Sequence, residues 1–283
     1  MIRSDNHVHT SYSADAEESM YEMLQRAVKL NFSSICFTDH MDYGFPEFEP
    51  GMIYLFDAQK YLDEIQAARP HFPMLEIRQG VELGLKPDVI EECQKLTASF
   101  PFDFVIGSTH LIDDMDPYYP VFWEGSEEKT AIRRYYEVTL KNTLLPFDYD
   151  VYGHLDYILR YTPTMKQLKQ EGRSTDAYLE KQCHEFADII DEILRQIILR
   201  GRGIEVNTAG LKYGMGHTNP HEWILSRYHE LGGEIITVGS DAHEKKHLGY
   251  QFARIPALLL QCGLRYYTEF SDRNAKMLPV TES

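Results

Sequence analysis

Apolar residues recur along the chain with helical spacing in two long stretches. One apolar face near the N-terminus is formed by Met20, Met23, Leu24, Ala27 and Val28, which are spaced three and four residues apart. The stretch Phe186–Ile198 has the same spacing and predicts a helix over 175–200, ended by Gly201. The polar stretch 162–176 has only weak periodicity, and we interpret it as a surface connection.

Short runs rich in β-branched and aromatic residues predict buried strands. After a first strand that ends near His9, these runs are Ser34–Thr38, Leu75–Val81, Phe104–Ser108, Asp150–Tyr152, Ile204–Val206 and Ile235–Val238. Helical segments separate several of them, which favours a parallel sheet, either open or closed into a barrel. About six or seven such units fit this length, which is slightly short for the usual eight-fold barrel.

A histidine, aspartate or glutamate follows almost every predicted strand. In chain order these residues are His7 and His9, then His40, Glu82, His110 and His154, then Asp241 and His243. In a barrel the carboxyl ends of all strands meet at one rim, so side chains far apart in the sequence would lie in one small volume. With Asp15, which follows the first strand, they form a cluster of potential ligands that includes six imidazoles.

Such a cluster is unfavourable without cations, because the carboxylates repel one another and burial penalises every charge. Imidazole nitrogen suits zinc, iron and manganese, and carboxylate oxygen suits harder ions such as manganese. His7 and His9 are two residues apart, so on a strand both point to the same side and can reach one ion. Nine ligands are too many for a single ion. At three or four ligands each, with one bridging carboxylate, they suit three divalent ions (Zn, Mn or Fe).

Composition narrows the class of protein. The 283 residues include 28 Lys and Arg against 44 Asp and Glu, a net charge of −16, which argues against nucleic acid as the main partner. A hydrophobic content of 43% excludes a disordered chain, and no apolar run is long enough to span a bilayer. The N-terminus lacks a signal peptide. The four cysteines form no C-x-x-C pair, and we interpret them as buried free thiols in a reducing compartment. We therefore expect a cytoplasmic enzyme.

Six short motifs at the predicted strand ends together resemble one known family. They are Asp5-x-His7-x-His9-Thr10-x-x-Ser13, Thr38-Asp39-His40, Gly80-Val81-Glu82, Gly107-Ser108-Thr109-His110, Gly153-His154-x-Asp156 and Gly239-Ser240-Asp241-Ala242-His243. Their order and types resemble the polymerase and histidinol phosphatase (PHP) family. The resemblance implies a distorted (β/α)7 barrel, with residues 1–283 forming one domain. It also implies hydrolysis of L-histidinol phosphate to L-histidinol and phosphate, a step of histidine biosynthesis, by a metal-activated hydroxide.

The resemblance further implies three metal sites. The first ion would be held by His7, His9, Glu82 and Asp241, the second by Glu82, His110 and His154, and the third by Asp15, His40 and His243. Glu82 would bridge the first two ions, and Glu82 and Asp241 would be catalytic. Other branches of the family carry histidine at the position of Asp15, which suggests a harder third site here.

Several neighbours of these motifs are candidates for binding a small phosphomonoester. Arg160 follows the His154 strand, and we expect it to clamp the phosphate with two parallel hydrogen bonds. Asn207 ends a strand and Lys212 lies in the loop after it, so either could contact substrate. Further candidates are Asp39, Asp42 and Asp156, which could orient imidazoles, and Tyr118 and Tyr119, which could shape the pocket.

Three alternatives remain at this point. The same metals could serve another phosphomonoester, nucleotides or oligonucleotides, although the chain has no basic stripe for a polynucleotide. The cluster could be a structural metal module, but structural zinc sites are usually closed and rich in sulfur. An amidohydrolase on a similar barrel would typically use a modified lysine as the bridging group, and no lysine ends a predicted strand.

Overall fold

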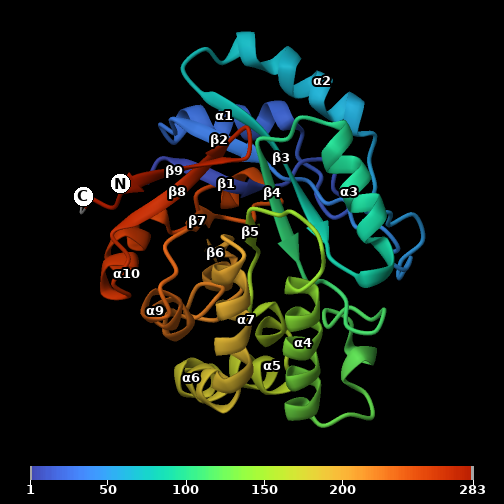
Figure 1. Ribbon diagram of the computed structural model, residues 1–283, viewed down its shortest axis with the longest axis vertical. Helices are drawn as coiled ribbons and strands as arrows, with labels where there is room; N and C mark the ends of the chain where they lie inside the picture. The colour runs from blue at the N-terminus through green and yellow to red at the C-terminus, as the bar shows by residue number, and fades with distance from the viewer. Residues whose placement is uncertain (1, 282–283) are drawn as a thin grey trace.

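The computed structural model describes residues 2–281, and a barrel of parallel strands forms its centre (Figure 1). The strands follow one another around the barrel in sequence order. They are β1 (Ser4–Val8), β2 (Ser34–Phe37), β3 (Glu76–Gly84), β4 (Phe104–Ser108), β5 (Val151–Tyr152), β6 (Gly203–Asn207) and β7 (Ile236–Gly239). Each predicted strand is present, and all but β4 have shifted ends. The largest shift is in β3, which continues past Val81, so that Glu82 lies within the strand and not after it.

The barrel closes between its last strand and its first. The N–H of Asp241, just after β7, donates to the carbonyl of His7 at 2.9 Å, and the N–H of His9 donates to the carbonyl of Ala242 at 3.0 Å. Val8 and Ala242 also form an isolated parallel bridge. Seven parallel strands closed in this way confirm the expected (β/α)7 barrel.

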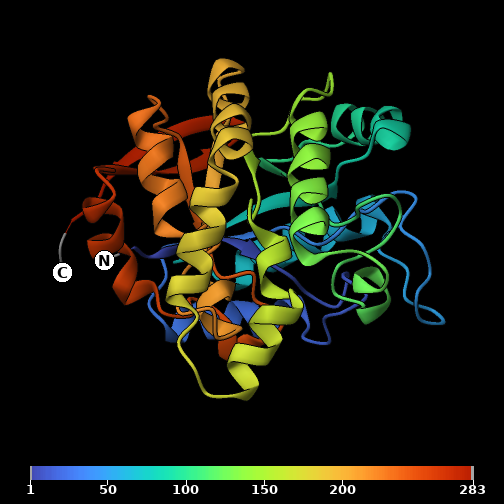
Figure 2. The same ribbon diagram turned by 90° about the horizontal axis from the view of Figure 1, so that it is seen from below.

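Helices surround the strands, as Figures 1 and 2 show from two directions. They are α1 (Met20–Lys29), α2 (Ala58–Ala68), α3 (Ile90–Ser99), α4 (Glu128–Thr143), α5 (Pro163–Gln170), α6 (Asp176–Glu185), α7 (Ala187–Leu199), α8 (Ala209–Lys212), α9 (Glu222–Glu230) and α10 (Ile255–Gln261). Helices α4 and α7 pack side by side and cover the same side of the barrel. Of the described residues, no helix is both long and apolar enough to cross a membrane.

Two predictions from periodicity were wrong. The helix expected over 175–200 is two helices, because Phe186 has non-helical dihedrals (φ −108°, ψ 17°) and separates α6 from α7. The stretch 162–176, interpreted as a connection, contains α5. The hydroxyl of Thr162 accepts from the N–H of Met165 and caps this helix, and Pro163 follows at its first position. With only Met165 and Leu168 buried, α5 shows too little apolar periodicity to be recognised.

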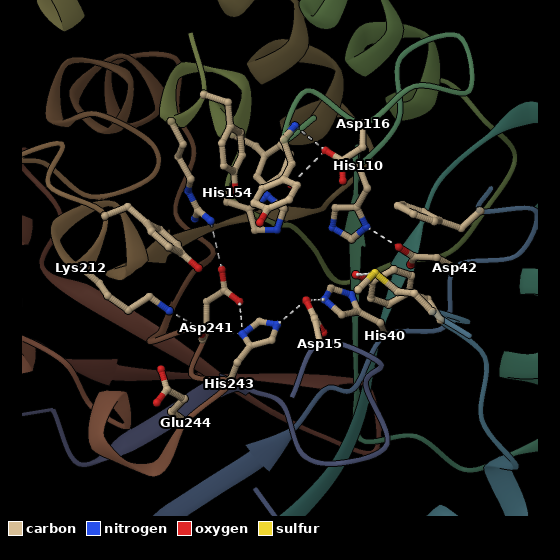
Figure 3. Close-up of a pocket in the computed structure, with 18 of the residues that line it drawn as sticks. Asp15, His40, Asp42, His110, Asp116, His154, Lys212, Asp241, His243 and Glu244 are labelled. Atoms are coloured by element: carbon tan, nitrogen blue, oxygen red, sulfur yellow. Dashed lines mark hydrogen bonds and ion pairs between the residues drawn. The ribbon is translucent and has the colours of Figure 1, made fainter. Parts of the chain in front are cut away.

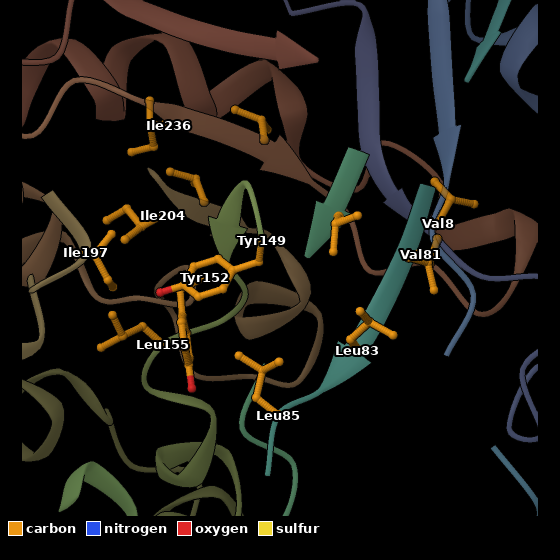
Figure 4. Close-up of a cluster of buried hydrophobic side chains, with 14 of the residues drawn as sticks. Val8, Val81, Leu83, Leu85, Tyr149, Tyr152, Leu155, Ile197, Ile204 and Ile236 are labelled. Carbon is orange, nitrogen blue, oxygen red and sulfur yellow. The ribbon is translucent and has the colours of Figure 1, made fainter. Parts of the chain in front are cut away.

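The main apolar core lies between the strands and the surrounding helices (Figure 4). Successive residues of a strand point to opposite sides, so Val81 and Leu83 point outward into this core while Glu82 between them points into the barrel. On the other side of the barrel, Ile204 and Ile236 pack in the same layer. The alternation therefore places one acidic side chain inside the barrel, between two apolar residues that fix the strand.

A two-stranded hairpin covers the amino-terminal end of the barrel. It consists of β8 (Tyr266–Ser271) and β9 (Asn274–Pro279), which the sequence patterns had not indicated. Phe270 of β8 stacks on Phe104 of β4, with ring centroids 5.2 Å apart. Arg78 of β3 is only 3% exposed and pairs with Glu269. The hairpin thus closes the end of the barrel opposite the predicted ligands.

Candidate metal centre

Glu82 lies at the centre of the predicted ligands and is fully buried. One of its oxygens, Oε2, is 3.0 Å from His7 Nε2, 3.5 Å from His9 Nε2 and 3.1 Å from His40 Nδ1. The other, Oε1, is 3.2 Å from His110 Nε2 and 2.9 Å from His154 Nε2. A single carboxylate between five imidazoles matches the position that was expected to bridge two ions.

The carboxylate of Asp241 is a second acidic group close to imidazoles of the cluster. Its Oδ1 lies 3.8 Å from His7 Nε2, 3.4 Å from His9 Nε2 and 3.5 Å from His243 Nδ1. Asp241 has a positive φ of 52°, in the left-handed region that few residues other than glycine adopt readily. The strained backbone directly after β7 therefore turns this carboxylate toward His7 and His9.

Asp15, His40 and His243 form the outer part of the cluster (Figure 3). Asp15 Oδ2 is 3.2 Å from His243 Nε2 and 3.9 Å from His40 Nε2. The imidazole of His9 stacks between the other two rings, with centroids 4.3 Å from that of His40 and 4.1 Å from that of His243. The structure therefore brings all nine predicted ligands to the carboxyl end of the barrel.

The donor set fits divalent cations. The nitrogens His9 Nε2, His40 Nδ1 and His243 Nε2 are buried and lie 3.1 to 3.5 Å from carboxylate oxygens, but none of them makes a well-oriented hydrogen bond among the described residues. Buried polar atoms in native proteins are normally hydrogen-bonded, so this concentration of ring nitrogens facing carboxylates without hydrogen bonds indicates ligands for a cation. All donors are nitrogen or oxygen, a set that suits zinc, iron or manganese.

The electrostatics of the cluster lead to the same conclusion. Burial alone would raise the pKa of Glu82, but His7, His40 and His110 hold it well below its usual range. Burial and the neighbouring charges of His243 and His40 lower the pKa of His9 well below its usual range. Glu82 is thus ionised and His9 is neutral, which are the forms in which a carboxylate and an imidazole bind metal.

Further side chains orient the imidazoles from behind. Glu205 Oε1 of β6 lies 2.7 Å from His7 Nδ1, and Asp42 Oδ2 lies 2.6 Å from His110 Nδ1. The hydroxyl of Ser13 lies 3.0 Å from His9 Nδ1 and donates to Asp39 at 2.7 Å. Contacts of this kind fix which ring nitrogen faces a metal.

Of the three aspartates expected to orient imidazoles, only Asp42 contacts one directly. Asp39 acts through the hydroxyl of Ser13. Asp156 instead accepts from the side chain of Asn219 and from the N–H of His221 at 2.9 Å. Sequence reasoning missed Glu205, although one signal was present: a carboxylate between Ile204 and Val206 in an apolar run must point into the barrel.

Two glycines allow the strands to approach this closely. A Cβ on Gly239 of β7 would lie 2.3 Å from the Cβ of His7. A Cβ on Gly153 would lie 2.4 Å from the hydroxyl of Ser108, which donates to Glu82 at 2.6 Å. The glycines of these two motifs therefore leave room for ligand-bearing neighbours.

A cavity of about 1010 Å³ opens over the cluster (Figure 3). Predicted ligands that line it are Asp15, His40, His110, His154, Asp241 and His243. Arg160, Lys212, Tyr118 and Tyr119, all predicted from the sequence, line it as well. The potential ligands are thus open to a small molecule on one side.

The two basic residues of the cavity lie beside Asp241. Arg160 is buried, and its Nη1 lies 3.4 Å from Asp241 Oδ2. The ammonium of Lys212 donates to the carbonyl of Asp241 at 3.3 Å. Asn207 is fully buried behind them, where its amide bonds Asp241 at 3.2 Å and its oxygen accepts from Arg160 at 3.4 Å. In this position Asn207 holds the guanidinium of Arg160 in place.

Comparison with known proteins identifies the family. A family model described as the PHP domain matches residues 5–209, which includes seven of the nine predicted ligands. The chain belongs to the PHP domain family. The resemblance seen in the motifs is thereby confirmed. Asp241 and His243 lie beyond the matched range, and the closure of the barrel between β7 and β1 brings them to the predicted ligands within that range.

Relatives of this PHP protein cover nearly its whole length. A "Probable histidinol-phosphatase" of Clostridium acetobutylicum is 30% identical over 92% of this chain and 94% of its own. The histidinol-phosphatase of Lactococcus lactis is 30% identical over 98% of this chain and 99% of its own. A crystal structure of L. lactis histidinol phosphate phosphatase, complexed with zinc, L-histidinol and phosphate, has a TM-score of 0.83 at 28% identity. It covers 97% of this chain and 99% of its own.

Proposed function

We propose that this PHP protein is a metal-dependent phosphatase that hydrolyses L-histidinol phosphate to L-histidinol and phosphate, a step of histidine biosynthesis. The observation that carries the proposal is Glu82, a fully buried carboxylate between five imidazoles beneath a cavity that also presents Arg160. The likeness to a phosphatase solved with zinc, L-histidinol and phosphate supports the substrate.

Three groups of residues would hold the ions. The first is His7, His9, Glu82 and Asp241, the second is Glu82, His110 and His154, and the third is Asp15, His40 and His243. When bound at such a site, divalent ions lower the pKa of water and offset the charge of a phosphate. Three ions, and their identity as zinc, manganese or iron, are part of this proposal.

The protein's own contribution is to bind and orient the phosphate. Arg160 is held by Asn219, whose oxygen accepts from Nε at 2.7 Å, and by Asn207 and Asp241. A guanidinium fixed on three sides can donate to two phosphate oxygens without losing further freedom. Lys212 adds a second positive charge on the same wall. In the overall hydrolysis, the oxygen of a water molecule bonds to phosphorus as the P–O ester bond breaks, and a proton from that water ends on the leaving oxygen, which becomes the hydroxyl of L-histidinol.

The wider setting follows from the same proposal. We take residues 1–283 as one metallophosphatase domain, supported by the packing of the hairpin β8–β9 on the barrel. The four cysteines are free and buried, which suits the reducing cytoplasm. The partner is a small phosphomonoester and not a nucleic acid, in keeping with the net charge of −16.

The test is phosphate release from a panel of phosphomonoesters, with single-stranded DNA and nucleotides included. The protein is treated with a chelator and then assayed after separate addition of Zn, Mn, Fe and Co. We expect no activity after chelation, recovery with at least one metal, and the highest kcat/KM for L-histidinol phosphate. Dominant release of nucleotides from DNA would instead identify a nuclease and contradict the proposal.

A further inference from the structure

The cavity over the metal centre has two basic residues on one wall, and a buried aspartate lies across from them. Arg160 and Lys212 form a basic wall beside Asp241. Across the cavity from Lys212 lies Asp116, which follows β4 in the loop before α4 (Figure 3). L-Histidinol phosphate has a similar separation of charge, with an anionic phosphate at one end, an imidazole at the other and an amine between them. The basic wall accounts for the phosphate, which leaves Asp116 without an assigned role.

Asp116 is held in a fixed orientation. Its Oδ1 accepts from the N–H of Tyr118 at 2.8 Å and from the hydroxyl of Tyr157 at 3.4 Å. The ring of Tyr157 lies next to the basic wall, with the Cζ of Arg160 5.4 Å from its centroid. Tyr157 therefore connects the expected phosphate clamp to Asp116 and fixes the spacing between them.

Asp116 is a buried carboxylate that is in no direct ion pair. It is 8% exposed, and no ion pair within residues 2–281 involves it. Burial raises its pKa to about 6, although the charge of nearby His110 acts in the opposite direction, so at neutral pH the group is ionised. Other acidic residues of the cavity differ: Asp42 contacts His110, Glu18 and Glu22 pair with Lys245, Glu244 pairs with Lys246, and Glu17 and Glu49 are exposed to solvent. A buried charge without a partner is costly, and a cation that enters the cavity would offset that cost.

The aromatic rings around Asp116 suit the same kind of ligand. Tyr118 packs edge-on against Tyr119 and Tyr161, with centroids 5.0 Å and 5.6 Å away. Tyr118, Tyr119, Tyr157 and Tyr161 all line the cavity. Aromatic faces attract cationic nitrogen and stack on flat rings such as imidazole.

We propose that Asp116 determines specificity by pairing with a cationic nitrogen of the substrate while the phosphate lies at Arg160. The inference rests on the proposed phosphatase function and deepens it. It assigns this cavity to phosphomonoesters that carry an amine or an imidazole. Asp116 takes no part in breaking the ester bond.

The test compares the wild type with Asp116→Asn on three substrates. Asparagine keeps the oxygen that accepts from Tyr118 and removes only the charge. The substrates are L-histidinol phosphate, its analogue without the amino group, and p-nitrophenyl phosphate, which has neither cationic group. For L-histidinol phosphate we expect kcat/KM to fall about 10- to 100-fold, mainly through a higher KM, as for loss of one charged hydrogen bond. For p-nitrophenyl phosphate we expect no change.

The analogue identifies which nitrogen binds. If its kcat/KM is unchanged in Asp116→Asn, the partner is the ammonium, and if it falls, the partner is the imidazole. Both results support the proposal. An equal loss on all three substrates would overturn it, because Asp116 would then act on the fold or the chemistry. No loss on any substrate would also overturn it.

A matched control variant distinguishes the loss of a charge inside the cavity from the loss of a charge elsewhere in the same loop. Asp114 lies two residues away, pairs with Lys86 and does not line the cavity. Asp114→Asn removes the same charge and should leave all three kcat/KM values unchanged. The two proposals fail separately. If the wild type released no phosphate from L-histidinol phosphate, the proposed function would fail, whereas unchanged selectivity in an active Asp116→Asn variant would refute only the role of Asp116.

Discussion

At the scale of single residues, the function depends on charged groups that the fold buries. Burial of these charges is energetically unfavourable when no ligand is bound. Glu82 is fully buried among imidazoles, and Arg160 is buried beside Asp241. A protein gains nothing in stability from such an arrangement unless cations and an anion complete it. Substitution of one such residue should therefore affect ligand binding more than folding.

Arg160 provides the first prediction. In Arg160→Ala the phosphate loses a fixed bidentate donor, so kcat/KM for L-histidinol phosphate should fall about 100-fold or more, as for other preorganised donors. Arg160→Lys should recover little, since an ammonium cannot donate in the same geometry. The control is Arg173→Ala, an exposed arginine paired with Glu171. Steady-state kinetics that showed a loss of only a few-fold would remove Arg160 from the phosphate site.

Glu205 provides the second prediction. Its Oε1 lies 2.7 Å from His7 Nδ1 and orients that ring toward Glu82. Glu205→Gln keeps the shape but weakens this contact, so metal affinity should fall about 10- to 100-fold. Competition with a chromogenic chelator measures the affinity directly. Unchanged affinity in a folded variant would show that His7 does not need this support.

The sequence revealed single residues only where they formed a pattern. The nine proposed ligands could be predicted because most of them lie at or after the ends of the predicted strands, and the barrel brings strand ends together. Glu205 was missed because it lies between two apolar residues in the middle of a predicted strand. The environment of Asp116 could not be predicted because Tyr157 and Arg160, which define it, come from a different loop.

At the scale of elements, the hairpin β8–β9 stabilises the barrel from the end opposite the metal centre. Arg78 is buried there, where Glu269 pairs with it, Asn6 accepts from it at 3.2 Å and Ser34 at 2.7 Å. The guanidinium joins three strands of the barrel to the hairpin. In the hairpin, the carboxylate of Glu269 compensates the positive charge of this guanidinium.

The third prediction concerns this ion pair. Glu269→Gln should lower the free energy of unfolding by about 3 kcal/mol, because it leaves a buried guanidinium poorly compensated. The metal-loaded protein should keep its kcat at 25 °C, since the hairpin lies far from the cavity. Glu76 also contacts Arg78 but is more than half exposed, so Glu76→Gln should cost less than about 1 kcal/mol. Urea unfolding measures both, and equal effects would contradict the assigned role of Glu269.

Elements were predicted where periodicity was strong and missed where it was weak. Six of the seven barrel strands were found as short runs rich in apolar, β-branched and aromatic residues, whereas β1 is mostly polar. The break at Phe186 was missed because the apolar spacing continues past it, although its dihedrals are not helical. The hairpin was missed because β9 is mostly exposed and lacks alternation.

At the scale of the whole molecule, closure of the barrel turns a linear series of motifs into one site. The hydrogen bonds between the residues after β7 and those of β1 bring Asp241 and His243 to His7 and His9, more than 230 residues away in the chain. A net charge of −16 would oppose the binding of an anionic substrate. Bound divalent ions, together with Arg160 and Lys212, would reverse that charge locally.

The most direct measurement of the central claim is anomalous X-ray diffraction from crystals of the metal-loaded protein, recorded above and below the absorption edge of the added metal. We predict three anomalous peaks per chain. One peak should lie on each side of the Glu82 carboxylate, and the third should lie between Asp15, His40 and His243. Peaks confined to other surfaces of the molecule, or no peak within bonding distance of Glu82, would contradict the account.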